Sequence, residues 1–290
     1  MGHHAYCIIA HNNPRQFFML LDLLNDHRND IYIHVDKKAD IRKFTPPTHI
    51  SHDANIKFIP NRVKVYWGDE SQIVCELNLL EAAILSGVEY DYIHLLSGVD
   101  LPLKSQDEIH SFFDCHRGEE FIEFSTSEFN LQDLKSKTEF PILFGKYLSR
   151  KDWFAKYIGR NLYRGSRVFI KLLGIKSKYN VQLQKGPNWF SITGGLATWL
   201  VSHRKEIIKT FRYAWCCDEM MLQTYAPISP FAKNISPLGN LRKIDWTRGT
   251  PYVWRNEDFD ELMRSDALFA RKFSLTDEPE IIHRIIEKLK

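Results

Sequence analysis

The chain has 290 residues, of which 44% are hydrophobic and 26% are charged, as in an ordinary soluble globular protein. No apolar run approaches the ~20 residues of a membrane-spanning helix. The net charge is only +3, and no nucleic-acid-binding motif accompanies it, so neither a membrane-spanning protein nor a nucleic-acid-binding protein is indicated.

The first 125 residues alternate short apolar runs with amphipathic stretches. Apolar runs of strand length occupy residues 6–10, 31–35, 56–59, 92–96 and 120–124. Helical spacing of apolar residues marks residues 14–24, 70–85 and 106–113. Alternation of this kind predicts an α/β fold with a mostly parallel central sheet.

Polar residues follow three of these predicted strands. They are His11 after the first strand, Asp36 after the second, and Gly98 and Asp100 after the strand at 92–96. Ligands of parallel α/β sheets bind outside the carboxyl ends of the strands, so we expect these loops to open on one edge. Asp36 suits a hydrogen bond to a ribose or a uracil edge, and it equally suits an ordinary turn.

A basic segment then interrupts the alternation and predicts an inserted helical arm over about residues 140–180. Between residues 146 and 178 the only acid is Asp152. The ten cations there are Lys146, Arg150, Lys151, Lys156, Arg160, Arg164, Arg167, Lys171, Lys176 and Lys178. Aromatic residues interleave with them. The pattern fits an amphipathic element on an anionic membrane surface, and it also fits a solvated helical arm.

The second half contains an acidic pair with chemical potential. Asp218 and Glu219 open a mostly apolar segment that is predicted to be helical over residues 219–225. Such a pair is usually a helix cap, but a carboxylate is also the base needed to deprotonate a sugar hydroxyl. Upstream, a strand predicted over 185–191 carries Trp189, either as core packing or as a wall for a sugar ring. Further helices are predicted at 204–213 and after Pro279.

Metal-ligating patterns are weak. His11, His34 and Asp36 lie at strand ends and would suit a metal-dependent hydrolase, although their spacing matches no ligand motif. The acids Asp258 and Asp260 form an Asp-x-Asp pattern that opens a run of helical spacing, so we expect them to start a helix. The five cysteines show no metal-ligand spacing, which favours reduced thiols in a cytosolic setting.

Cations near the C-terminus offer a substitute for a metal on a diphosphate. They are Arg248, Arg255, Arg271 and Lys272. Guanidinium and ammonium groups stabilise a leaving diphosphate as a metal ion would. A surface Arg-Lys pair that covers a hydrophobic edge explains Arg271 and Lys272 equally well.

Several of these features occur together in one known family. The matching segments are residues 5–11, 33–38, 67–68, 95–104, 185–193, 218–219, 245–246 and 268–273. In order and spacing they cover nearly the whole chain. It resembles a bacterial member of glycosyltransferase family 14, which contains core-2/I-branching β-1,6-N-acetylglucosaminyltransferases and peptide O-xylosyltransferases.

The resemblance implies a GT-A fold, a UDP-sugar donor, inversion at the anomeric carbon, and catalysis without a metal or another cofactor. It makes Glu219 the catalytic base and Lys272 the diphosphate ligand. The partner arginine of Lys272 is Arg248 by best spacing, with Arg255 as the alternative, and Arg271 is a further candidate for the diphosphate. The donor nucleotide would meet His11, Asp36, Gly98 and Asp100. The acceptor would meet Trp189, Asn188 and Asp218. We expect none of the membrane anchor, stem and disulfides of the animal members, and the basic arm has no counterpart in them.

We therefore expect one GT-A domain over residues 1–290, with a donor-binding half at about 1–125 and an acceptor and catalytic half at about 181–290. The predicted function is transfer of a sugar, N-acetylglucosamine first, to a glycan acceptor in bacterial surface polysaccharide synthesis. A free and a lipid-linked acceptor are both compatible with this prediction, so we expect the enzyme in the cytoplasm or at the inner face of the membrane. No nucleic-acid partner is expected.

Two alternatives of other classes stay open. One is a metal-dependent hydrolase that uses His11, His34 and Asp36. The other is a non-catalytic glycan-binding or membrane-binding protein that keeps the fold.

Overall fold

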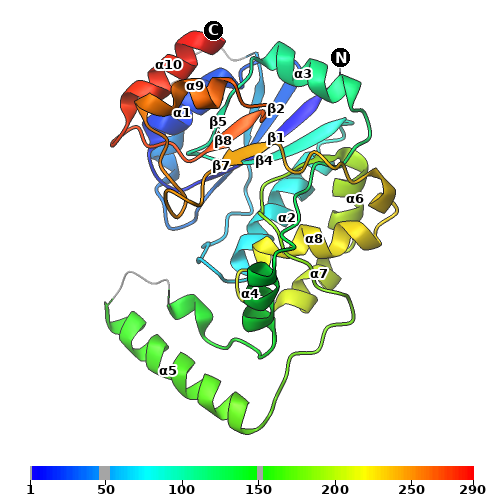
Figure 1. The fold of residues 1–290 in the computed structure, drawn as a ribbon, viewed down its shortest axis with the longest axis vertical. Helices are drawn as coiled ribbons and strands as arrows, with labels where there is room; N and C mark the ends of the chain where they lie inside the picture. The colour runs from blue at the N-terminus through cyan, green and yellow to red at the C-terminus, as the bar shows by residue number, and fades with distance from the viewer. Residues whose placement is uncertain (1, 46–52, 149–152) are drawn as a thin grey trace.

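The computed structural model describes residues 2–45, 53–148 and 153–290, and a five-stranded sheet forms its centre (Figure 1). The strand order is β3-β2-β1-β4-β6. The strands are β1 (His4–Ala10), β2 (Asn29–Val35), β3 (Asn55–Phe58), β4 (Tyr92–Ser97) and β6 (Ser191–Thr193). The first four run parallel, and β6 is antiparallel to β4. The predicted α/β class with a mostly parallel sheet is confirmed.

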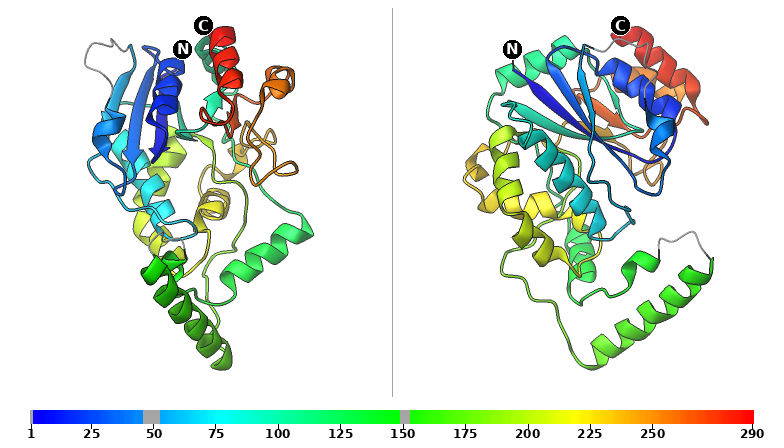
Figure 2. Two further views of the ribbon diagram at one scale, coloured as in Figure 1. Left: turned by 90° about the vertical axis from the view of Figure 1, so that its left-hand side faces the viewer. Right: turned by 180° about the vertical axis from the view of Figure 1, so that it is seen from behind.

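Helices cover both faces of this sheet (Figures 1 and 2). On one face lie α1 (Pro14–Leu23), α3 (Gln106–Cys115) and α10 (Pro279–Leu289). On the other lie α2 (Ser71–Ile84), α6 (Gly194–Ser202), α7 (Arg204–Phe211) and α8 (Met221–Tyr225). Successive side chains of a strand point to opposite faces, so Tyr6 and Ile8 enter the first core while Ala5 and Cys7 enter the second.

A small second sheet brings the C-terminal cations to the main sheet. It consists of β5 (Leu101–Pro102), β8 (Phe269–Arg271) and β7 (Arg242–Ile244) in the order β5-β8-β7. Because Leu101 pairs with Ala270, β8 lies directly beside the loop that follows β4. The short helix α9 (Phe259–Met263) precedes β8. Further single turns are η1 (Ile41–Phe44), η4 (Ala226–Ile228), η5 (Ala232–Asn234) and η6 (Asn256–Asp258).

Three predicted elements differ from the structure. The stretch 120–124 forms only isolated bridges, from Glu120 to Ile235 and from Phe121 to Ser191. Of the strand predicted over 185–191, only the last residue belongs to β6. Glu219 does not begin a helix, because it ends the 3₁₀ turn η3 (Cys217–Glu219), and α8 begins only at Met221.

The basic segment forms an arm. It contains η2 (Gly145–Tyr147) and α5 (Trp153–Leu172), and α4 (Glu128–Thr138) precedes it. Helix α5 stands apart from the rest of the molecule (Figures 1 and 2). The predicted residues Arg150, Lys151 and Asp152 lie outside the described residues. Within the described part of the chain, no helix combines the length and apolar character needed to cross a bilayer.

Candidate functional site

The loops after β1, β2 and β4 meet at one edge of the sheet, as their positions predict. The backbone N–H of Asp36 donates to the carbonyl of Ala10 at 2.8 Å, and the N–H of Gly98 donates to the carbonyl of Ile9 at 3.0 Å. His11 is exposed at the same edge. The structure therefore brings together the four residues predicted for the donor nucleotide.

The two aspartates of this edge are engaged within their own turns. The Asp36 carboxylate accepts from the backbone N–H of Lys38 at 2.8 Å. The Asp100 carboxylate accepts from the N–H and the hydroxyl of Ser97, each at 2.7 Å. Both carboxylates are buried, so in this state they shape the loops that a donor would contact.

Arg271 connects this edge with the segment that carries Trp189. Its guanidinium pairs with Asp100 at 2.8 Å and donates to the Ser97 hydroxyl. The same guanidinium lies over the Trp189 ring, 4.6 Å from its centroid. Trp189 is only 9% exposed, so its ring is covered by a cation here and does not present an open platform for a sugar.

Lys272 lies in a tightly held stretch beside this edge, which we call the donor edge after the role predicted for His11, Asp36, Gly98 and Asp100. The N–H of Phe273 donates to the carbonyl of Val99 at 3.0 Å, and the Gln16 side chain donates to the carbonyl of Phe273 at 3.0 Å. Lys272 itself is half-buried, and no carboxylate among the described residues lies within ion-pair distance of its ammonium. Its charge is not neutralised within that part of the chain.

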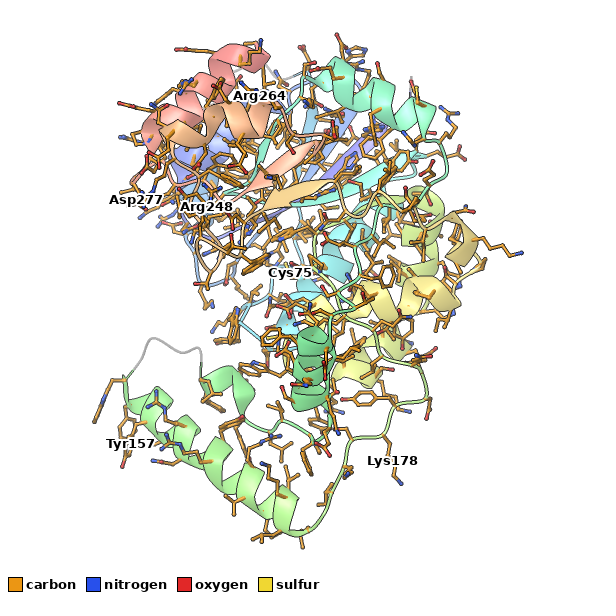
Figure 3. The ribbon with its side chains drawn as sticks, in the orientation of Figure 1. Cys75, Tyr157, Lys178, Arg248, Arg264 and Asp277 are labelled. Carbon is orange, nitrogen blue, oxygen red and sulfur yellow. The ribbon has the colours of Figure 1, made fainter. Side chains whose placement is uncertain are left out.

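Arg248 is saturated with carboxylate partners. Its guanidinium pairs with Asp245, with Asp258 at 2.7 Å and with Glu261 at 3.1 Å. Figure 3 labels Arg248 on the side of the molecule that carries the C-terminal helix. This network favours a structural role for Arg248.

Arg255 is less engaged than Arg248. Its side chain is 56% exposed, and its contact with Glu278 is 3.9 Å long. Its backbone N–H donates to Asp258, which precedes α9 and behaves as the predicted helix-start acid. The Arg255 guanidinium is therefore the more accessible of the two predicted arginine partners of Lys272.

Glu219 lies in a cluster of two lysines and two acids. Its Oε2 is 3.0 Å from the ammonium of Lys137 and 3.3 Å from that of Lys185. Asp133 pairs with the same two lysines, at 2.8 Å with Lys137. Burial opposes the charge of Lys137, but the hydrogen bond to Asp133 and the charge of Glu219 outweigh burial and raise the pKa of Lys137.

The backbone around Glu219 is fixed by the segment that begins at Lys185. The N–H of Gly186 donates to the carbonyl of Glu219 at 2.9 Å. A Cβ at Gly186 would lie 2.0 Å from the carbonyl oxygen of Glu123, so only glycine fits. Cys216 adopts a left-handed conformation (φ 52°) and turns the chain into η3. The Glu219 carboxylate stays about one-third exposed, at 34%.

Asp218 belongs to a buried pair of acids. Its Oδ2 accepts from the Gln72 side chain at 2.6 Å, and its Oδ1 has no hydrogen-bond partner among the described residues. Burial and then the charge of Glu219 raise the pKa of Asp218 to about 7. Burial and the charge of Asp218 raise the pKa of Glu76, which lies 3.5 Å from the Asn188 amide. The structure therefore brings Asn188 and Asp218 to the same acid.

Sequence reasoning missed Lys137, Asp133 and Glu76, and it gave Lys185 no role. Lys137 and Asp133 come from α4, about eighty residues before Glu219, and no local pattern joins them. Glu76 carried one signal, because it is an acid between Cys75 and Leu77 on the buried face of α2.

The metal-dependent hydrolase alternative needs a metal site that includes His11, His34 and Asp36. Within the described part of the chain these residues do not form one. His34 is buried, and its Nε2 accepts from the N–H of Val63 at 3.0 Å. Burial is the main cause that lowers the pKa of His34 to about 4. Residues 2–45, 53–148 and 153–290 contain no group of three His, Cys, Asp or Glu side chains placed to hold a metal ion.

Comparison with solved structures finds a distant likeness. The crystal structure of mouse xyloside xylosyltransferase 1 in its apo form covers 93% of this chain and 97% of its own, with 10% identity and a TM-score of 0.40.

Comparison with curated proteins finds relatives along nearly the whole chain. Xylosyltransferase 2 of Mus musculus is 23% identical and covers 96% of this chain. Xylosyltransferase oxt of Drosophila melanogaster is 21% identical and covers 95%. This chain spans 32%, or about a third, of the length of each. The human N-acetyllactosaminide β-1,6-N-acetylglucosaminyltransferase is 23% identical, with 95% of this chain and 69% of that protein covered.

The family itself is shown by a match to a family model. Residues 4–262 match the family model described as Core-2/I-Branching enzyme. Because this match covers most of the chain, the protein belongs to the Core-2/I-Branching enzyme family.

Proposed function

We propose that the protein is an inverting glycosyltransferase with a GT-A fold that needs no metal. It moves a sugar from a UDP-sugar to a hydroxyl of a glycan acceptor, and N-acetylglucosamine is the first candidate for that sugar. The observation that carries the proposal is the position of Glu219. Its partly exposed carboxylate is held between Lys137 and Lys185, and its backbone is fixed by Gly186. Membership of the family supports the same reaction.

In the proposed reaction, Glu219 takes the proton of the acceptor hydroxyl as the oxygen attacks the anomeric carbon. The new C–O bond forms on the face opposite the nucleotide, and the bond between the anomeric carbon and the diphosphate breaks. Inversion follows from this single displacement. Lys137 and Lys185 hold the carboxylate in one orientation while the acceptor approaches.

The electron pair of the broken bond leaves on UDP, and nearby cations stabilise its charge. Lys272 is the first candidate, because no described carboxylate neutralises it. Arg255 and Arg271 are further candidates. The three carboxylates around Arg248 favour a positioning role for that residue.

We place the reaction in bacterial surface polysaccharide synthesis, in the cytoplasm or at the inner face of the membrane. The acceptor in this setting is a glycan that carries a lipid. The support is the basic arm, which the relatives' motifs do not account for.

The substitution Glu219→Gln tests the assigned base. It should lower transfer by about 100-fold or more, since an amide cannot accept the proton. UDP should still raise the melting temperature of the variant as it does for the wild type. The matched control, Glu280→Gln on α10, changes an exposed acid far along the chain and should transfer normally. Turnover retained by Glu219→Gln would refute the assignment.

Metal independence is tested separately. Transfer and UDP-dependent stabilisation should both persist in excess EDTA, because protein cations and not a metal ion meet the diphosphate. Loss of transfer in EDTA, with recovery on adding Mg²⁺ or Mn²⁺, would contradict this part of the proposal and leave the role of Glu219 standing.

A further inference from the structure

Helix α5 carries a stripe of exposed apolar side chains. Those of Phe154, Ile158, Leu162, Phe169 and Leu172 are between 43% and 80% exposed. At about 100° per residue they fall within one side of the helix. A helix in water exposes scattered apolar residues, but a continuous stripe of this length is a surface that something else covers.

The charges of α5 are all positive. Its sequence contains five cations and no acid, and at about 100° per residue the exposed Arg160 and Arg164 lie on the flank of the helix that also carries Trp153 and Tyr157. Trp153 and Tyr157 stack on each other at 5.9 Å, and both are more than half exposed. Figure 3 shows Tyr157 on the side of α5 that points away from the body of the protein.

The inner side of α5 is accounted for within the chain. A Cβ at Gly159 would lie 2.1 Å from the Cβ of Tyr147, so the helix contacts η2 there. Ile170 is 4% exposed, and Arg167 lies over the Phe140 ring at 5.7 Å. The contacts to the body therefore leave the apolar stripe uncovered.

An open hollow enlarges the apolar surface. It has a volume of about 580 Å³, lies between Phe144 and α5, and is lined mainly by Phe144, Ile158, Leu162 and Phe169. The lining is apolar enough and the volume large enough to receive part of a hydrocarbon chain. The hollow continues the stripe and does not form a second site.

We propose that this face of α5, with the hollow, docks on an anionic lipid bilayer. The helix lies in the plane of the interface, with the stripe among the upper acyl chains and Arg160 and Arg164 among the anionic headgroups. Trp153 and Tyr157 suit the headgroup level, where amphipathic rings accumulate.

Charge argues against the other occupants of such a face. In a two-fold dimer through α5, neither helix would offer an acid to pair with the cations of the other. A bilayer with anionic headgroups supplies both the apolar phase and the opposite charge. The inference rests on the proposed function only for its setting at a membrane, since binding itself does not require the transfer reaction.

Vesicle flotation of the full chain tests the proposal. The protein should float with vesicles of phosphatidylglycerol and phosphatidylcholine and stay unbound with phosphatidylcholine alone. The double variant Arg160→Glu with Arg164→Glu should weaken binding on the order of tenfold or more. The double variant Leu162→Gln with Phe169→Gln should weaken it similarly, because the stripe loses apolar area.

The matched control is Lys205→Glu with Lys209→Glu. These two cations are exposed on α7 at the same spacing, so reversing them should leave flotation unchanged. Glu219→Gln should float like the wild type, which separates failure of docking from failure of the catalytic assignment. Each variant is first checked by circular dichroism. If a variant is unfolded, a salt titration of wild-type flotation replaces it, and binding should fall as salt rises.

Two results would overturn the proposal. One is flotation without the expected selectivity. This means either that the wild type floats equally with anionic and neutral vesicles, or that the α7 control loses as much flotation as the α5 variants. The other is a wild-type dimer in sedimentation velocity that the Leu162 and Phe169 substitutions convert to a monomer, since the stripe would then be covered by a second copy.

Discussion

Arg271 is the residue through which the donor edge meets the segment of Trp189. It is bound to Asp100 and stacked on Trp189 at the same time, and Asp100 is only 3% exposed. Removing the guanidinium would leave a buried carboxylate without its cation, which is more costly than removing both partners.

The variant Arg271→Gln should therefore lose about 3–5 kcal/mol of unfolding free energy, measured in urea. Adding Asp100→Asn should recover part of that loss, because the uncompensated charge disappears. Equal stability of the single and double variants would contradict a coupling between the two side chains.

Asp218 gives folding stability a pH dependence. Its pKa is raised from 3.8 to about 7 in the folded protein, so between these values the native state keeps a proton that the unfolded state has released. The stability that the protonated Asp218 carboxyl gives the folded state is therefore fully present below pH 3.8. It declines as the pH rises toward about 7.

The substitution Asp218→Asn should flatten this decline in unfolding free energies measured across that pH range. Glu76→Gln should act in the same direction, because its pKa is also raised. The control Asp266→Asn changes an exposed acid and should keep the wild-type slope. An unchanged slope in Asp218→Asn would show that another group carries the dependence.

At the scale of elements, the segment 185–190 shows where sequence patterns stop being informative. Continuous apolar runs predict β1, β2 and β4 correctly, because buried parallel strands need such runs on both faces. The 185–190 segment has the composition of a strand, but its backbone pairs mainly with Glu219 and Ser125, and only Phe190, at its end, pairs with strand β4, through the N–H of Leu95.

The candidate site divides in the same way. The donor edge was predictable, because strand ends of a parallel sheet converge by topology. The set of matching segments along nearly the whole chain also predicted membership of the family, and that is confirmed. The partners of Glu219 were not predictable, because Lys137 belongs to α4, far from Glu219 in the sequence, and reaches it only through tertiary packing.

Gly186→Ala tests the packing of this segment. The added methyl group would lie 2.0 Å from the carbonyl oxygen of Glu123, so the segment must move and the Glu219 backbone with it. We expect a loss of transfer activity together with a lower melting temperature. In the control Gly165→Ala, no atom lies within 4 Å of the new methyl group, and alanine should stabilise α5 by up to about 1 kcal/mol. Similar behaviour of both variants would contradict the close fit.

At the scale of the whole molecule, the arm and the body differ in how much of each helix is buried. Most of α2 lies in one of the two cores, whereas most of α5 is exposed. Local opening costs less where few apolar contacts are lost.

Amide hydrogen exchange should therefore be faster in α5 than in α2 by at least about tenfold. Anionic vesicles should slow exchange in α5 and leave α2 unchanged. Equal protection of both helices in the absence of vesicles would contradict a loosely attached arm.

The indole ring of Trp215 lies between the arm and the body of the protein. A Cβ at Gly145, in η2 of the arm, would lie 2.6 Å from the ring of Trp215, and a Cβ at Gly68 would meet the same ring at 2.6 Å. The next residue, Cys216, turns the chain toward Glu219. The arm and the turn that leads to Glu219, the proposed base, thus meet at this ring. Suppose that lipid binding shifts this ring and thereby changes the affinity for the acceptor. By thermodynamic reciprocity, acceptor binding must then change the affinity for lipid by the same free energy.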